Sequence, residues 1–196
     1  DTSWMTGIIF YLKKDIPIVH GHINFLDSEW AITAISQPQF WPGVHVPSRG
    51  SGNVEGILSA IISNWGTPLM GGTLSAMDCD RQKLVDEVWR QLKEHLNDPT
   101  KPAILSDADV VHTDIAPGLQ FHSVPGTPFP HGHWTNSEPL FINEKDSWFY
   151  RPNAVTGIDN FDLAADYVRT YPDLATMESA NEAARWAVNW ILHRVG

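Results

Sequence analysis

The order of apolar and polar residues in the first third of the chain predicts several β-strands. Apolar runs at residues 7–12, 30–36 and 56–65 are short and stop at Lys, Gln or Gly, which is typical of strands. Residues 16–26 alternate between apolar and polar positions, so we expect a further strand there that forms a hairpin with the first. The run 56–65 is almost entirely apolar, which predicts a strand in the middle of the sheet.

Two longer segments show the spacing of helices with one buried face. Between residues 80 and 96 apolar residues recur every three or four positions, and Asp78 or Asp80 can cap the first turn. A second helix is expected from Met177 onward. The residues expected on its buried face are Met177, Ala180, Ala184, Ala187, Val188 and Ile191.

Composition narrows the class of protein. The 196-residue chain has a formal net charge of −10, which argues against nucleic-acid binding because that function needs a basic surface. The single cysteine, Cys79, cannot form an internal disulfide or a cysteine-rich metal cluster, and we expect a reducing, cytoplasmic location. No apolar run reaches the roughly 18 residues of a membrane span. The sequence is compatible with peripheral contact between the protein and a membrane surface.

The stretch 161–178 is the most informative part of the sequence. A short apolar strand is expected at 161–165 and ends at Asp166, and a turn then leads to the last helix, with Asp173 or Thr176 as its cap. A carboxylate accepts a hydrogen bond from a hydroxyl group, and the free N–H groups and dipole of a helix start favour negative charge. The stretch therefore suits a polyhydroxylated, partly anionic ligand.

Residues 163–170 (LAADYVRT) and 173–180 (DLATMESA) resemble the C-terminal FAD-contacting segment of the phytoene-desaturase and amine-oxidase superfamily of flavoproteins. The resemblance implies that Asp166 holds the ribityl chain of FAD. It also implies that the backbone of residues 176–178 faces the pyrimidine end of the isoalloxazine. The cofactor-binding residues implied in this way are Ala165, Asp166, Tyr167, Ala175, Thr176, Met177 and Glu178.

Two features depart from that family. Ala165 and Ser179 stand where glycine is common, although both are small enough to allow close approach to the cofactor. The N-terminal βαβ unit of the family, with its Gly-x-Gly-x-x-Gly turn, is not found. The nearest sequence, residues 50–56, has its last glycine one position late and is followed by a predicted strand instead of a helix. We therefore expect a second polypeptide to carry the N-terminal, dinucleotide-binding half.

Strands gathered early in the chain and a helix at its end predict an α+β or α/β fold. Residues 1–152 are expected to form a mixed β-sheet with helices, because their order of strands resembles the substrate domain of bacterial desaturase-like flavoproteins. Residues 153–196 are expected to be the C-terminal strand and helix of an FAD-binding domain of the glutathione-reductase type.

Histidine occurs in two His-Gly-His pairs. Alternation along residues 16–26 places His20 and His22 on one strand face, and if this face lines a substrate cavity either could act as an acid or base. They are the candidate catalytic residues, and the alternative is that they only pack in the sheet. His131 and His133 form the second pair, but nothing in the sequence brings the two pairs together, so we expect no metal site.

The first functional hypothesis is an FAD-dependent oxidoreductase that is active only with its missing N-terminal half. The resemblance implies hydride transfer between the flavin N5 and an apolar, isoprenoid-type small molecule. Nine tryptophans fit a large apolar cavity for such a substrate, and ordinary core packing explains them equally well. A redox-neutral isomerase or dehydroxylase would use the same residues. The second hypothesis is a non-catalytic partner subunit of a flavoprotein.

Overall fold

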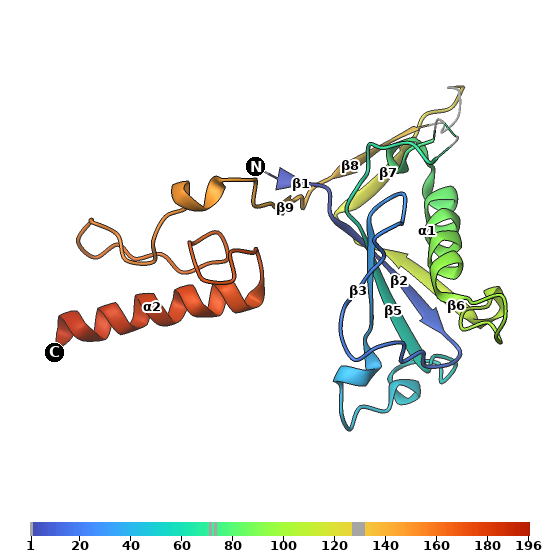
Figure 1. Cartoon of the computed structure of the whole chain (residues 1–196), viewed down its shortest axis with the longest axis horizontal. Coiled ribbons are helices and arrows are strands. Elements are labelled where there is room, and N and C mark those ends of the chain that lie inside the picture. Colours follow the sequence, from blue (N-terminus) through green and yellow to red (C-terminus); the bar gives the residue numbers. More distant parts are fainter. Residues whose placement is uncertain (1, 71, 73, 127–131) are drawn as a thin grey trace. The chain divides into compact units, whose positions relative to one another are not determined.

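A computed structural model of the chain describes residues 2–70, 72, 74–126 and 132–196. The fold is mixed α+β and divides into two compact units (Figure 1). Unit 2 is Trp4–Pro139, and unit 1 combines Asp1–Ser3 with Leu140–Gly196. This boundary lies earlier in the chain than the one expected after residue 152, because the segment that follows Pro139 pairs with the N-terminal strand.

Unit 2 is built on a five-stranded antiparallel sheet in the order β3-β4-β5-β2-β6. Its strands are β2 (Thr6–Leu12), β3 (Ile23–Asn24), β4 (Ile32–Ser36), β5 (Gly56–Ile62) and β6 (Val110–Ile115). The three apolar runs therefore form strands as predicted, and β5 is the central strand. One face of β5 is buried and the other is only partly exposed, which accounts for its almost continuous apolar sequence.

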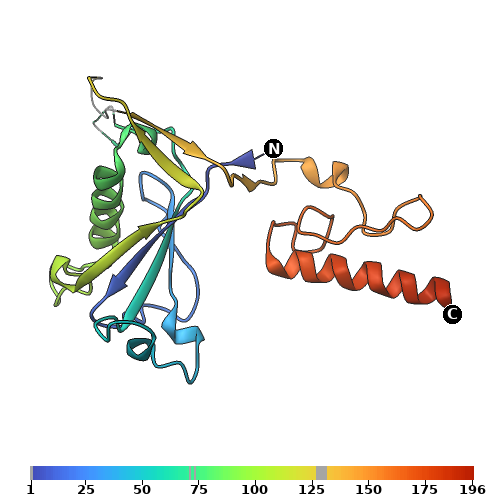
Figure 2. The same cartoon turned by 180° about the vertical axis from the view of Figure 1, so that it is seen from behind.

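One face of this sheet carries the core. Along β2, β4 and β5 buried and partly exposed residues alternate, because successive side chains point to opposite faces. The buried face packs against helix α1 (Arg81–Leu96), which lies along the sheet in both views (Figure 1 and Figure 2). The main core residues are Ile8, Phe10, Leu12, Ile32, Ala34, Leu58, Ala60, Ile62, Leu84, Val88, Trp89 and Leu92.

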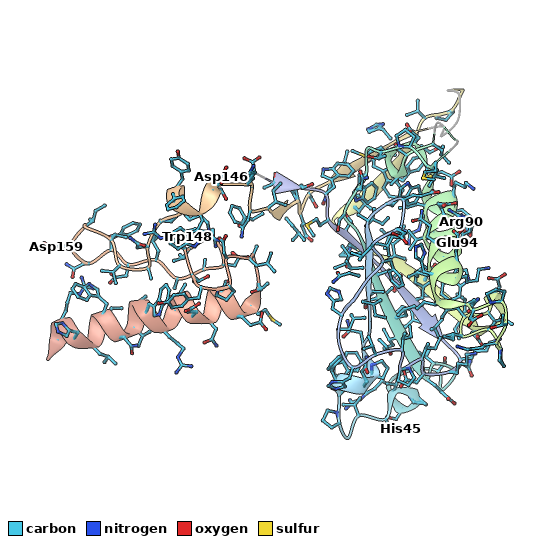
Figure 3. All side chains as sticks on the ribbon, in the orientation of Figure 1. His45, Arg90, Glu94, Asp146, Trp148 and Asp159 are labelled. Atoms are coloured by element: carbon cyan, nitrogen blue, oxygen red, sulfur yellow. The ribbon has the colours of Figure 1, made fainter. Side chains whose placement is uncertain are left out.

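Helix α1 has the bounds that its spacing predicts. Asp80 caps its first turn by accepting a hydrogen bond from the Lys83 N–H at 2.8 Å. The Arg90 guanidinium forms ion pairs of 2.6 Å with Glu87, whose side chain is buried, and with the exposed Glu94, and Figure 3 labels Arg90 and Glu94. The cap stabilises the start of the helix, and the ion pairs stabilise its second half.

Residues 16–26 do not form the predicted strand. Only β3 is extended here, and it pairs with β4 instead of β2, so the predicted hairpin is wrong. Pro17 has no N–H group to give to a ladder, which disfavours a strand at this point. Ile16 and Phe25 are buried in the core and anchor the segment as a loop.

A separate two-stranded sheet completes unit 2. Strand β7 (Leu119–Ser123) pairs with β8 (Gly132–Asn136) in antiparallel register. Trp134 on β8 is buried, and its Nε1–H donates a 2.7 Å hydrogen bond to the backbone carbonyl of Cys79. The Cys79 side chain is itself fully buried in the core.

We expect Cys79 to resist alkylation in the folded protein. Burial raises the pKa of its thiol to about 12 from an ordinary 9.0, with smaller effects of Lys83 and nearby carboxylates. At pH 8 this lowers the fraction of reactive thiolate roughly a thousandfold relative to the unfolded chain. Iodoacetamide labelling followed by mass spectrometry, with and without urea, measures the difference. Rapid, complete labelling without urea would show that the thiol is accessible.

The raised pKa of the Cys79 thiol also makes the stability of the fold depend on pH. The folded state holds the Cys79 proton more tightly than the unfolded state, so this contribution to stability is complete below pH 9. It is then lost as the pH rises towards 12, the pKa of the thiol in the folded state.

Unit 1 contains one two-stranded sheet, a short 3₁₀ helix and a long helix. Its elements are β1 (Thr2–Ser3), β9 (Leu140–Phe141), η5 (Ser147–Tyr150) and α2 (Met177–Val195). The strand expected at 161–165 is not formed, since this segment makes one isolated bridge, Val155 with Asp162, and Asp166 lies in a turn. A strand needs a partner along its length, and the described part of unit 1 offers none there.

Helix α2 buries a different face from the predicted one. Its buried residues are Ser179, Ala183 and Ala187, of which only Ala187 belongs to the predicted face. Small side chains here let the helix approach the loop that contains Ala154 and Val168. The predicted apolar residues Met177, Val188 and Ile191 are exposed instead. In the described parts of the chain, no helix is both long and apolar enough to cross a membrane.

Candidate functional site

A buried arginine holds the loops of unit 1 together. The Arg151 side chain is only 4% exposed. Its guanidinium donates hydrogen bonds to the backbone carbonyls of Asp166 at 2.8 Å, Tyr167 at 3.2 Å and Val168 at 2.7 Å. It also forms a 2.5 Å ion pair with Asp173. One side chain therefore fixes both the turn that contains Asp166 and the turn that precedes α2.

The aspartates of the stretch 161–178 differ in what their carboxylates contact. Asp162 forms a 2.5 Å ion pair with Arg194, and Asp173 is held by Arg151. No group among the described residues pairs with the carboxylate of Asp166, which is partly exposed. Its backbone is fixed while its side chain is free, so Asp166 can accept a hydrogen bond from a ligand.

The cation closest to Asp166 in sequence is occupied elsewhere. Arg169 donates two hydrogen bonds to the side-chain oxygen of Asn153, at 3.1 and 2.5 Å. Its guanidinium also lies 4.7 Å from the ring centroid of Trp148, which Figure 3 labels. Arg169 is therefore not paired with Asp166, and the part of the chain that the structure describes offers Asp166 no other ion pair.

The first turn of α2 has free N–H groups. Thr176 is the N-cap, and its Oγ1 accepts a hydrogen bond from the Ser179 N–H at 3.2 Å. The N–H groups of Met177 and Glu178 have no partner among the residues that the structure describes. Both residues are exposed, so their N–H groups can meet an external acceptor. Of the other residues expected to bind FAD, Ala165, Ala175 and Thr176 are partly buried and Tyr167 is exposed.

A shallow groove of about 590 Å³ runs along α2. Met177 and Glu178 line one end, and Trp186 and Asn189 line the other. The rest of the helix exposes further apolar side chains, namely Val188, Ile191, Leu192 and Val195. Exposed apolar surface of this extent on one helix is typical of a surface that another molecule covers.

The two candidate catalytic histidines lie in unit 2, in a bend before β3. His20 and His22 are both exposed, and the His20 ring contacts Phe40 at a centroid distance of 4.7 Å. They do not share a strand face, because the strand on which that expectation depended is not formed. A catalytic role for either histidine therefore stays a prediction without geometric support.

The second histidine pair is described only in part. His131 lies outside the described residues, and His133 stacks on His122 across the β7–β8 pair with ring centroids 5.3 Å apart. The Nε2 atom of His122 lies 2.8 Å from the hydroxyl of Thr135. A search of the described residues finds no group of three or more His, Cys, Asp or Glu side chains that could hold a metal ion.

The glycine-rich residues 50–56 lack the setting of a dinucleotide-binding turn. Residues 50–55 form a loop, and Gly56 is the first residue of β5, so a strand follows as predicted and no helix offers its N-terminus to a pyrophosphate here. This loop therefore does not fit the pyrophosphate of FAD, and the residues expected to contact the rest of that cofactor all lie in unit 1.

Arg151 is the structural residue that the sequence analysis missed. It follows the aromatic run Trp148, Phe149 and Tyr150 and precedes Pro152. These three aromatic residues are exposed, so the run gives no local signal that the neighbouring charge is buried.

Comparisons of the chain with models of protein families, with curated proteins and with solved structures found no match. The interpretation of the site accordingly depends on the residues and contacts of the chain itself.

Proposed function

We propose that this chain is the C-terminal part of an FAD-dependent oxidoreductase of the phytoene-desaturase and amine-oxidase kind. The observation that carries the proposal is the free carboxylate of Asp166, which shares a scaffold with the free N–H groups at the start of α2. Arg151 connects the two, since it binds the Asp166 carbonyl and the Asp173 carboxylate. The same sequence segments carry the resemblance to the FAD-contacting segment of those flavoproteins.

In this proposal each part of the site has a separate task. The Asp166 carboxylate accepts a hydrogen bond from a ribityl hydroxyl and so positions the cofactor. The N–H groups of Met177 and Glu178, with the dipole of α2, stabilise negative charge at the pyrimidine end. FAD, when bound, supplies the capacity to accept a hydride from an apolar, isoprenoid-type substrate. An isomerase or dehydroxylase that returns the hydride would need the same contacts.

A second polypeptide completes the site in this proposal. It would supply the pyrophosphate-binding βαβ unit and cover part of the exposed apolar surface of α2. The exposed side chains of Val188, Ile191 and Leu192 support such a partner, because leaving them in water forfeits the free energy of burying them. This surface also fits the second hypothesis, a non-catalytic partner subunit of a flavoprotein.

The test is the absorbance spectrum of the natively purified protein, together with a denaturing gel that shows which polypeptides are present. We expect flavin bands and a second polypeptide. Replacing Asp166 with alanine should lower FAD retention roughly tenfold or more, because a charged hydrogen bond is lost. The matched control is Asp159→Ala, in the same unit, whose exposed side chain Figure 3 labels. It should retain FAD like the wild-type protein.

Two results would contradict the proposal. A sample that contains the second polypeptide but shows no flavin absorbance would favour the non-catalytic partner. Equal FAD retention by Asp166→Ala and Asp159→Ala would remove Asp166 from the cofactor site.

A further inference from the structure

The sheet of unit 2 carries a polar cluster on the face opposite α1. Phe10 and Leu12 point into the core, so Tyr11 between them points to the other face. In the β2–β6 register Tyr11 pairs with His112 and Ile9 pairs with Asp114. The three polar side chains Tyr11, His112 and Asp114, here called the Tyr11 cluster, are therefore neighbours on one face at the edge of the sheet.

Contacts within the Tyr11 cluster are specific. The Tyr11 and His112 rings stack with centroids 5.9 Å apart, and His112 Nε2 lies 3.2 Å from Asp114 Oδ1. Burial, then the charge of Asp114 and a hydrogen bond to it, raise the pKa of Tyr11 above its ordinary value. The Tyr11 hydroxyl therefore stays protonated at neutral pH, and its oxygen keeps a lone pair for another donor.

A pocket of about 320 Å³ adjoins the Tyr11 cluster. One wall comes from the loop that follows His45, a residue labelled in Figure 3. Its apolar lining includes Val46, Pro47, Val54 and Ile57, and the Tyr11 cluster forms the polar part. This volume lies in the range of small-molecule sites, which combine apolar walls with a few convergent polar groups.

The charges of the pocket indicate what kind of ligand it takes. Among the lining residues only Arg49 and Asp114 carry a full charge, and their charges are opposite. The lining therefore has no net charge, and a charged ligand would lose hydration without a full compensating charge. A neutral hydroxyl group loses less hydration free energy than a charged group. It can also donate a hydrogen bond to the Tyr11 oxygen or the Asp114 carboxylate.

We infer that this pocket of unit 2 binds a neutral, mainly apolar molecule that carries a hydroxyl group, of the class of medium-chain alcohols. The apolar walls surround the hydrocarbon chain, and the Tyr11 cluster accepts the hydroxyl hydrogen. All the residues involved belong to unit 2, so the inference holds whether or not unit 1 binds FAD.

The test is a titration of the full chain with octanol, followed by methyl NMR. We expect saturable shifts of the methyl signals of Val46, Val54 and Ile57. Octanoate and octylamine, which have the same chain length and a charged head group, should bind roughly tenfold more weakly. Tyr11→Phe and Asp114→Asn should each weaken octanol binding roughly fivefold, as expected for one lost hydrogen bond.

The matched control is Tyr150→Phe, because Tyr150 is an exposed tyrosine of unit 1. It should bind octanol like the wild-type chain. Unchanged signals of the core methyl groups confirm that each variant is folded. The inference is overturned if octanol gives no saturable shift, if all three probes bind equally, or if neither Tyr11→Phe nor Asp114→Asn weakens binding.

Discussion

Replacing Arg151 with methionine is expected to unfold unit 1 while the sheet of unit 2 stays intact. The change leaves three backbone carbonyls and the Asp173 carboxylate without their donor. The Asp173 carboxylate is 44% exposed and is hydrated once Arg151 is gone, so most of the cost comes from the carbonyls, at about 1–3 kcal/mol for each buried group left without a donor. Unit 1 has little apolar core to offset this loss, since the buried apolar residues in its described part are Ala154, Val168, Ala183 and Ala187.

Chymotrypsin digestion with mass mapping measures the effect of Arg151→Met. We expect rapid cleavage within residues 140–196 and continued protection of residues 4–139. Arg185→Met is the matched control, because Arg185 is exposed on α2 and has no ion pair among the described residues. Equal protection of unit 1 in both variants would show that the Arg151 contacts do not stabilise it.

Replacing Gly56 with alanine is expected to destabilise unit 2 by about 3 kcal/mol, as overpacking does. A Cβ atom at Gly56 would lie 2.1 Å from the Lys14 carbonyl oxygen and 3.0 Å from the Asp15 Cα. Both are backbone atoms, so neither can move aside as a flexible side chain would. The start of β5 would have to shift away from β2, with which Gly56 pairs at Leu12.

Urea unfolding, followed by the NMR signals of the β2–β5 pair, gives the free energy of unfolding of unit 2. Gly7→Ala is the control in the same sheet, because its Cβ would lie at an ordinary 3.8 Å from the nearest atom, the Ala60 carbonyl oxygen. The control should keep or gain stability, by up to about 1 kcal/mol from reduced chain entropy. If both variants unfold at the same urea concentration, the close approach at Gly56 has no energetic consequence.

The parts of the fold that were predicted correctly depend on local patterns. Strands β2, β4 and β5 and helix α1 each bury one regular face, and regular burial leaves a period in the sequence. The segment 16–26 has the same period but also contains Pro17, and its buried residues attach a loop to the core. Alternation alone does not distinguish these two cases.

The candidate site shows a second limit of prediction from local sequence. The start of α2 at Met177 follows from local sequence, and the structure confirms it; of the two caps that the sequence left open, Asp173 and Thr176, the structure shows Thr176. The buried face of α2 does not follow, because small residues such as Ser179 and Ala183 are buried by close packing that hydrophobicity does not register. The position of Arg151 depends on carbonyls 15 to 17 residues later in the chain, and no local spacing encodes that contact.

The pairing of β1 with β9 has a consequence for the order of folding. It joins Thr2 to Phe141 and Ser3 to Leu140, so the whole of unit 2 lies between the paired segments. During synthesis every residue of unit 2 leaves the ribosome before Leu140, and its sheet can form while β1 has no partner. The two residue pairs between β1 and β9 contribute little free energy. They offset only a small part of the chain entropy that is lost when a loop as long as unit 2 is closed. We therefore expect β1 to join last, once unit 2 has folded and brought its own two ends into place.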